Sequence, residues 1–323
     1  MELRQLRYYV AIVDHGSLSK AAVVLHIAQP ALTQQLRQLE DELGVQLLHR
    51  SAQGMLSTDA GKIFYEHALA ILKQVADARS AVTQSTERPS GSVTLGLPHS
   101  ISGALALPLL TAVRAQYPEI TLQLTEEITG NLSEQLKSGR INLAVLFDDG
   151  QLGGFATTAL VEEELRFISA SQPAGQASPA APGTASGSNE SEQSLTLAEA
   201  LQNTLILPSP LQGVRPRIDS VARQAGLSLP HVIEINSIAI LKSALLAHLG
   251  ATILPAAPVL DELKRGSMRS QRIEQPAISR TVVLCASKNI PLTNAAEAIR
   301  KLVQQVSIQL CTDQLWPGAT VLA

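Results

Sequence analysis

The sequence predicts an N-terminal all-α winged helix-turn-helix, joined by one long linker helix to a C-terminal α/β domain. Three observations support this fold class. Residues 16–44 contain two short amphipathic helices separated by a tight turn. Apolar residues then recur every three or four positions over residues 59–88 without a proline. After Gly91, apolar strands alternate with amphipathic helices, as they do in α/β domains.

The first short helix begins at Ser17, whose hydroxyl can cap the helix. Residues 26–28 form the turn, and Pro30 lies where the second helix begins, because a preset φ and a missing donor suit the first turn. The apolar face of the first helix consists of Leu18, Ala21, Ala22 and Leu25. The second helix is expected to bury one stripe, formed by Leu32, Leu36, Leu39 and Leu43.

The opposite face of the second helix is polar but nearly uncharged. Its glutamines can bond adenine, its threonine can meet a thymine methyl group, and its arginine can reach guanine or phosphate. A helix-turn-helix places this second helix in the major groove. A helical hairpin that serves only as a packing unit is the alternative interpretation. The predicted DNA-binding residues are Gln29, Pro30, Thr33, Gln34, Arg37 and, in the wing, Arg50.

A two-stranded wing is predicted after the second helix. Gly44 ends the helix, and residues 45–50 are predicted to be extended. Residues 51–54 form a turn, and residues 55–57 form the second strand, which runs back along the first. Thr58 then caps the long linker helix.

The linker helix carries a seam with a period of 3.5 residues, which is typical of a coiled coil. Such a stripe predicts pairing with a second copy of the chain, and a helix packed on its own domain is the alternative. The predicted dimerisation residues are Phe64, Ala68, Ile71, Val75, Ala78 and Val82.

The segment from Leu3 to Gly61 resembles the winged helix-turn-helix of LysR-type transcriptional regulators, and a looser resemblance covers most of the chain. A run at residues 26–32 is similar to that of the nitrogen assimilation control subgroup. Ala28, Gln34, Leu48 and Gln53 depart from the usual family pattern. The matching runs are Leu3-Arg4-Gln5-Leu6, Gly16-Ser17-Leu18-Ser19-Lys20-Ala21-Ala22, Gln29-Pro30-Ala31-Leu32-Thr33-Gln34-Gln35-Leu36, Leu47-Leu48-His49-Arg50 and Thr58-Asp59-Ala60-Gly61.

The resemblance implies an effector domain of two subdomains, like those of periplasmic binding proteins, with the chain crossing between them near residues 163 and 267. It also implies a dimer of dimers and RNA polymerase as a partner. A small-molecule effector would bind between the subdomains at Ser100, Ser102, Thr129, Phe147 and Ser209. Strand ends that precede helices favour the same edge, although serine and threonine there can be simple helix caps.

The predicted domains follow from these boundaries. They are residues 1–58 (winged helix-turn-helix), 59–89 (linker helix), 91–163 with 267–310 (effector subdomain I), 164–266 (effector subdomain II) and 311–323 (C-terminal tail). The alternation of strands and helices predicts a parallel sheet with crossover helices. Residues 171–192 are rich in Pro, Gly, Ser and Ala and read as a flexible, dispensable insertion.

Composition limits the function classes. A net charge of −3 offers no broad basic surface, so DNA binding depends on where the polar groups lie. Two cysteines make no disulfide framework, which fits a cytoplasmic protein; Cys285 reads as a core residue, with a redox-sensing pair as the alternative. Neither a signal peptide nor a membrane span is predicted.

Enzymatic signals are weak. The histidines show no metal-binding spacing, and neither a nucleophile elbow nor a phosphate-binding glycine loop is present, so neither a cofactor nor a metal is expected. The sequence favours a DNA-binding transcriptional regulator that responds to a small molecule. The alternative is a cytoplasmic small-molecule sensor or carrier whose helix-turn-helix is only a dimerisation arm.

Overall fold

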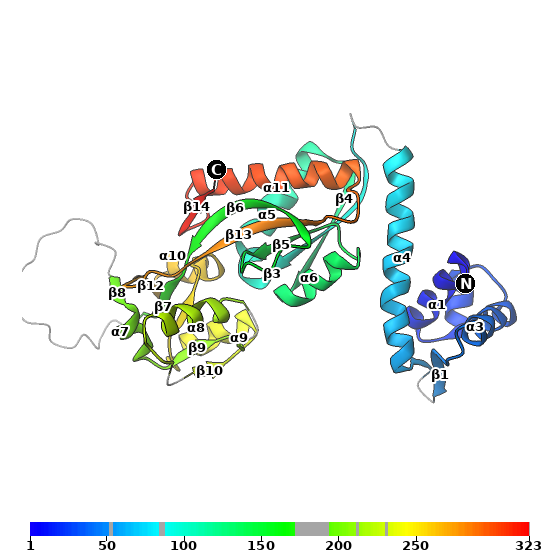
Figure 1. Cartoon of the computed structure of the whole chain (residues 1–323), viewed down its shortest axis with the longest axis horizontal. Helices are drawn as coiled ribbons and strands as arrows, with labels where there is room; N and C mark the ends of the chain where they lie inside the picture. The colour runs from blue at the N-terminus through cyan, green and yellow to red at the C-terminus, as the bar shows by residue number, and fades with distance from the viewer. Residues whose placement is uncertain (52–53, 84–87, 172–193, 211–212, 230–231, 323) are drawn as a thin grey trace, which may run out of the picture. The chain divides into compact units, whose positions relative to one another are not determined.

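The computed structural model describes residues 1–51, 54–83, 88–171, 194–210, 213–229 and 232–322. They form two compact units, each described by itself. The first unit contains the predicted helix-turn-helix, the wing and the long helix (Figure 1). Its elements are α1 (Leu3–His15), α2 (Leu18–Val24), α3 (Gln29–Leu43), β1 (Leu48–Ser51), β2 (Gly54–Ser57) and α4 (Asp59–Thr83).

The core of the first unit confirms the predicted helical hairpin. Apolar residues of α1, α2 and α3 meet those of the turn before the wing, and the buried members are Tyr9, Ile12, Leu18, Ala21, Ala22, Leu32, Leu36, Leu39, Leu47 and Leu48. The prediction was wrong for Leu43, which is 40% exposed. Leu43 is the last residue of α3, before Gly44 adopts a left-handed conformation, so it extends beyond the core.

Both predicted caps are present in this unit. The Ser17 hydroxyl accepts a hydrogen bond from the Lys20 backbone N–H at 3.4 Å, and the Thr58 hydroxyl accepts one from the Gly61 N–H at 3.0 Å. Helix α4 continues to Thr83, and the end predicted near Arg88 adjoins residues 84–87, which lie outside the described residues.

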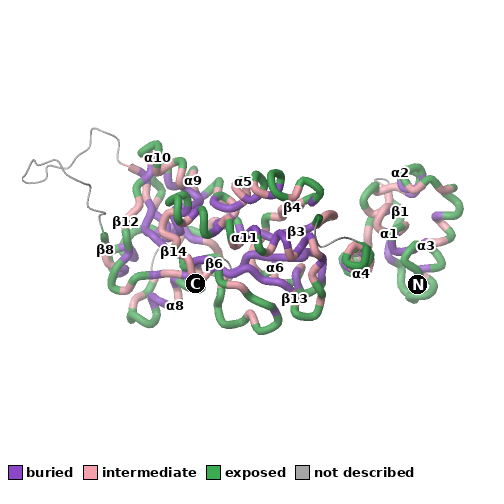
Figure 2. Tube along the Cα trace, turned by 90° about the horizontal axis from the view of Figure 1, so that it is seen from above, coloured by how far each residue is buried: buried purple, intermediate pink, exposed green. Residues whose placement is uncertain are grey.

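The second unit contains a six-stranded sheet in the order β14-β6-β13-β5-β3-β4. The helices α5 (His99–Gln116) and α11 (Asn294–Thr312) pack on one face, and α6 (Thr129–Lys137) packs on the other (Figure 1). Figure 2 shows the buried stretches of β3 and β13 in purple. The strands are β3 (Gly91–Pro98), β4 (Ile120–Glu127), β5 (Leu143–Phe147), β6 (Phe155–Glu164), β13 (Ser279–Ser287) and β14 (Ala319–Val321).

This sheet is mixed, so the prediction of a parallel sheet was wrong in part. Strand β3 runs parallel to β4 and β5, whereas β13 runs antiparallel to both β5 and β6. The direction of β13 is reversed because this strand enters from the other subdomain instead of following a crossover helix.

The other subdomain is built on a four-stranded sheet, β11-β7-β12-β8, and a parallel pair, β10-β9. Its strands are β7 (Arg166–Ala170), β8 (Ser194–Thr196), β9 (Leu205–Leu207), β10 (Val232–Glu234), β11 (Thr252–Leu254) and β12 (Met268–Glu274). Its helices are α7 (Leu197–Leu201), α8 (Arg215–Gln224), α9 (Ile238–Leu246), η1 (Ala257–Val259) and α10 (Leu260–Lys264). One apolar cluster joins these elements.

The chain leaves the six-stranded sheet after Glu164 and returns at Ser279. The return was predicted near residue 267, but β12 pairs with β7 and β8 and so belongs to the second subdomain. Its sequence, MRSQRIE, has few apolar residues and gave no strand signal.

The C-terminal segment is integrated into the fold, in contrast to the predicted tail at residues 311–323. Helix α11 continues to Thr312, the Trp316 side chain is 1% exposed, and β14 pairs with β6. Residues 172–192 of the predicted insertion lie outside the described residues. Among the helices that the structure describes, none combines the length and the apolar character needed to cross a bilayer.

Candidate functional site

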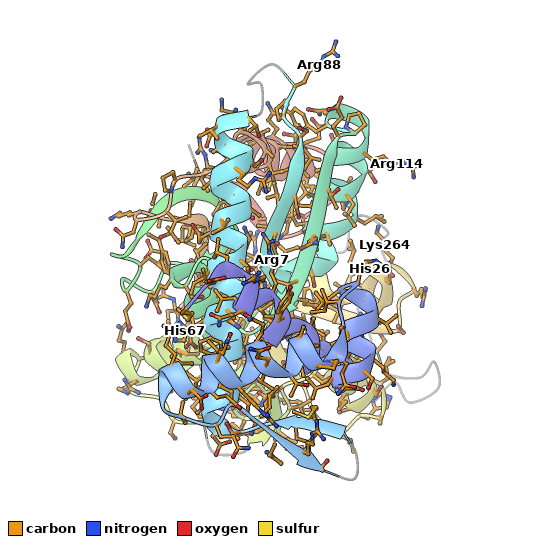
Figure 3. All side chains as sticks on the ribbon, turned by 90° about the vertical axis from the view of Figure 1, so that its right-hand side faces the viewer. Arg7, His26, His67, Arg88, Arg114 and Lys264 are labelled. Carbon is orange, nitrogen blue, oxygen red and sulfur yellow. The ribbon has the colours of Figure 1, made fainter. Side chains whose placement is uncertain are left out.

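The predicted base-reading residues lie on one exposed helix. Gln29, Pro30, Gln34 and Arg37 are exposed on α3, while the buried leucines of the same helix are Leu32, Leu36 and Leu39. Thr33 is half-buried, and its hydroxyl donates a hydrogen bond to the Gln29 carbonyl at 3.0 Å. Figure 3 shows α3 with the preceding turn, where His26 is labelled. The helix thus presents amide and guanidinium groups that need no partner within the protein.

The wing is held against α3 by a side chain that sequence analysis did not select. The Glu40 carboxylate accepts hydrogen bonds from the backbone N–H groups of Leu47 and Leu48, at 2.8 and 3.0 Å. Arg50 lies exposed on β1, two residues beyond this clamp. Because a carboxylate that binds two N–H groups fixes the backbone locally, Arg50 has a defined position relative to α3.

The start of α4 is packed tightly against α1. The Tyr9 hydroxyl donates to the Gly61 carbonyl at 2.8 Å, and the Tyr9 and Phe64 rings meet edge to face with centroids 5.1 Å apart. The Tyr65 hydroxyl donates to the Asp14 carboxylate at 2.5 Å; burial and this acid raise the pKa of Tyr65 to about 12. These contacts fix the linker helix to the DNA-binding helices.

The predicted seam is unevenly exposed. Phe64 packs on Tyr9 within its own unit, and Ala68 is buried. Farther along α4, Ile71 is 37% exposed and Val82 is 83% exposed. Val75 is half-buried and Ala78 is exposed. The dimerisation role of these residues stays a prediction.

An open cavity lies between the two subdomains of the second unit. Strand ends of β3, β4, β5, β9 and β10 meet there, together with the first residues of α5, α6 and α9. The described residues that line the cavity are Pro98, His99, Ser100, Glu127, Ile128, Thr129, Phe147, Pro208, Gly213, Val214, Ile235, Asn236, Ile238, Leu241 and Leu254.

The structure brings together three of the five predicted effector residues. Ser100, Thr129 and Phe147 line the cavity. Ser102 does not line it, and its hydroxyl donates to the Glu126 carboxylate at 2.7 Å. Ser209 is likewise outside the lining and donates its backbone N–H to the Asn236 side-chain oxygen at 2.9 Å. The role of all five residues in effector binding stays a prediction.

A buried ion pair next to the cavity was missed by sequence analysis. The Arg280 guanidinium donates to the Glu163 carboxylate through Nε at 2.8 Å and Nη2 at 2.6 Å, and Nη2 also donates to the Ser100 hydroxyl at 2.8 Å. Trp316 Nε1 donates to the second Glu163 oxygen at 2.9 Å. Burial lowers the pKa of Arg280, and the Glu163 charge opposes that shift. The sequence held one indication of this ion pair, which is the position of Arg280 at the start of the apolar strand β13.

The cysteines have the properties of core residues. Burial, followed by the nearby Asp148 charge, raises the pKa of Cys285 to about 12, and burial also raises the pKa of Cys311. They belong to different apolar clusters. Within the described ranges, no group of three or more His, Cys, Asp or Glu side chains is arranged to hold a metal ion.

Two family models match this chain. The model described as "Bacterial regulatory helix-turn-helix protein, lysR family" matches residues 3–62, and the model described as "LysR substrate binding domain" matches residues 86–307. The nitrogen assimilation regulatory protein nac of Escherichia coli K12 is 37% identical over 309 residues, which cover 95% of each chain.

Solved structures with the same fold are full-length regulators. A full-length OxyR variant from Pseudomonas aeruginosa has a TM-score of 0.68 at 20% identity and covers 94% of this chain and 98% of its own. Full-length CbnR in a complex with its target DNA has a TM-score of 0.67 at 21% identity and covers 95% of this chain and all of its own (100%). The chain therefore belongs to the LysR family of DNA-binding transcriptional regulators, and it is a regulator instead of an enzyme.

Proposed function

We propose that the protein reads its operator through α3 and the wing, with Gln29, Thr33 and Gln34 at base edges and Arg37 and Arg50 at base or phosphate. The observation that supports this most is a helix face with exposed Gln29, Gln34 and Arg37 and half-buried Thr33, opposite a face that is buried. Residues 1–58 contain five Lys and Arg against five Asp and Glu, so we expect low non-specific affinity and a specificity that depends on base contacts and symmetry.

Binding of labelled DNA from upstream of neighbouring genes tests this proposal. Arg50→Ala should weaken specific and non-specific binding alike and reduce the slope of log K against log salt by about 1, because one phosphate contact is lost. Arg114→Ala removes an exposed arginine at the end of α5 and is the matched control. An unchanged salt slope for Arg50→Ala would remove the wing from the proposed interface.

The second unit is proposed to bind a small-molecule effector in the cavity at Ser100, Thr129 and Phe147. Helix starts of α5 and α6 direct backbone N–H groups toward this edge, where they favour a polar or anionic group. A ligand bound only to the native state raises the melting temperature, so thermal-shift screening is the first test. Ser100→Ala and Thr129→Ala should then reduce the shift while DNA binding without ligand persists.

Assembly is proposed as a dimer of dimers in the cytoplasm, with α4 pairing two chains and RNA polymerase as the partner at the promoter. Ile71, Val75 and Val82 leave an apolar stripe on the distal part of α4. Val75→Asp would place an unpaired charge in that interface and should split the dimer. Light scattering that finds the parent protein monomeric at micromolar concentration would contradict the proposal.

A further inference from the structure

Arg280 is a buried cation with an incomplete set of hydrogen bonds. Its side chain is 4% exposed, and Nε and Nη2 bind Glu163 while Nη2 also reaches Ser100. Nη1 is enclosed and has no hydrogen-bond partner in the described part of the chain. An arginine has five N–H donors, and buried donors in native proteins are nearly always paired. Arg280 is not among the described lining residues, so its charge acts on the cavity through Ser100, which does line it.

The contact with Arg280 determines what the Ser100 hydroxyl can do. Because the Ser100 oxygen accepts from Nη2 at 2.8 Å, its own hydrogen must point elsewhere. No hydrogen bond donated by this hydroxyl is present among residues that the structure describes. Ser100 lines the cavity, so this end of the cavity offers a hydroxyl donor next to a fixed positive charge.

The other residues that line the cavity determine what kind of ligand fits beyond the group bound at Ser100. Phe147 lines the cavity and lies against the cation, with the Arg280 guanidinium carbon 3.7 Å from the ring centroid. Most of the other lining side chains are apolar, and they come from both subdomains. Glu127 is the acidic residue of the described lining, and its carboxylate accepts a hydrogen bond from Asn131 at 3.0 Å. A second negative charge on the ligand would be repelled by Glu127.

We propose that Arg280 is a positioning residue that makes this end of the cavity selective for a monocarboxylate with an apolar body. The carboxylate would accept from the Ser100 hydroxyl, which Arg280 Nη2 holds in place, and the apolar body would lie along Phe147 and the aliphatic lining. This inference rests on the proposed effector-binding function of the same cavity. Glu163 holds the guanidinium in place, so the selectivity depends on residues from β6 and β13 as well as α5.

The test compares acids with their neutral analogues. The full-length protein is titrated with butanoate, hexanoate and octanoate and with the corresponding primary amides. Binding is read from the fluorescence of Trp316, the single tryptophan, which donates to Glu163 at 2.9 Å, and independently by calorimetry. We expect the acids to bind about tenfold more tightly than the amides, because a charge-assisted pair is lost with the amide.

The variant Arg280→Lys tests whether Arg280 positions Ser100 for the ligand or only stabilises the fold. Lysine keeps the charge beside Glu163 but lacks the planar fork that reaches Ser100 at the same time, so the ratio of acid to amide affinity should fall toward unity. Ser100→Ala should lower the same ratio. Arg300→Lys is the matched control, because that guanidinium pairs with Glu297 on α11 and does not line this cavity.

The outcomes distinguish this inference from the proposed function. Equal affinity for acids and amides, or an unchanged ratio in Arg280→Lys, would overturn the role of Arg280 while leaving a ligand cavity in place. Absence of binding for every acid in both readouts would overturn the monocarboxylate proposal. If thermal-shift screening with other compounds also finds no ligand that depends on Ser100 or Thr129, the proposed effector function fails as well.

Discussion

The recognition face of α3 and the wall of the ligand cavity hold their polar side chains in opposite ways. Gln29, Gln34 and Arg37 are exposed, whereas Arg280 and Glu163 are buried and bound to each other. A side chain of the first kind can be removed at no cost to folding, and one of the second kind cannot. Substitutions should therefore separate the two regions: those on α3 change DNA binding alone, and those at the ion pair change stability first.

The largest effect is expected where the buried pair is broken on one side. Glu163→Leu leaves Arg280 charged and unpaired, and should lower the free energy of unfolding by about 3–5 kcal/mol. The double variant Glu163→Leu with Arg280→Met removes both charges and should recover most of that loss. Urea denaturation, followed by circular dichroism, measures both. A single variant as stable as the parent would show that the two regions do not differ in this way.

A smaller loss of stability is expected at a crowded helical glycine of the DNA-binding unit, Gly61. A Cβ at Gly61 would lie 2.1 Å from the Leu47 carbonyl oxygen and 2.8 Å from the Tyr9 hydroxyl. Gly61→Ala should therefore shift backbone and cost about 1–3 kcal/mol, lowering both the melting temperature and DNA affinity. In Gly130→Ala the added methyl group has no neighbour within 4 Å, so this helical glycine is the control.

On the recognition face, the expected change is in binding only. Gln29→Ala and Thr33→Ala should each weaken specific DNA binding by about 1–3 kcal/mol, with unchanged unfolding. Gln38→Ala is the matched control. It removes a glutamine from the C-terminal half of the same helix, where the Gln38 side chain accepts a hydrogen bond from Gln35 at 2.9 Å. Fluorescence anisotropy with cognate DNA measures all three. If Gln29→Ala and Thr33→Ala bind as the parent does, the recognition face lies elsewhere.

The smallest effect is expected at the buried thiol. Because burial raises the pKa of Cys285 to about 12, the group stays a neutral thiol at neutral pH and is a poor nucleophile. Cys285→Ala should leave DNA binding unchanged before and after treatment with hydrogen peroxide. Mass spectrometry of the treated parent should find Cys285 unmodified in the folded protein. Rapid oxidation of this residue would favour the redox-sensing alternative.

Local patterns were enough to predict the first unit. Each of its main features can be predicted from a few neighbouring residues, and the structure contains them. They are the spacing of Leu32, Leu36 and Leu39, the caps at Ser17 and Thr58, and the helix end at Gly44. The register of the buried stripe failed only at Leu43, where the helix ends.

Contacts between segments that are far apart in the sequence could not be predicted from local patterns. Arg280 and Glu163 are separated by 117 positions in the sequence, so no local spacing indicates their contact. Strand β14 and Trp316 belong to the sheet only because they meet β6, which lies far earlier in the chain. The resemblance, supported by the positions of strand ends, predicted Ser100, Thr129, Ser102 and Ser209 alike, but only Ser100 and Thr129 of these four line the cavity.

The paired strands that connect the two subdomains have a mechanical consequence. The ladder between β6 and β13 continues to Glu164 opposite Ser279, and the Leu165 N–H then bonds to the Ile278 carbonyl at 2.8 Å. A two-stranded ribbon can bend and twist with its ladder intact, but it resists sliding of one strand past the other, because sliding would break several hydrogen bonds together. The two crossings between the subdomains are thereby held in register, so a movement of one subdomain relative to the other carries both strands together as a single hinge.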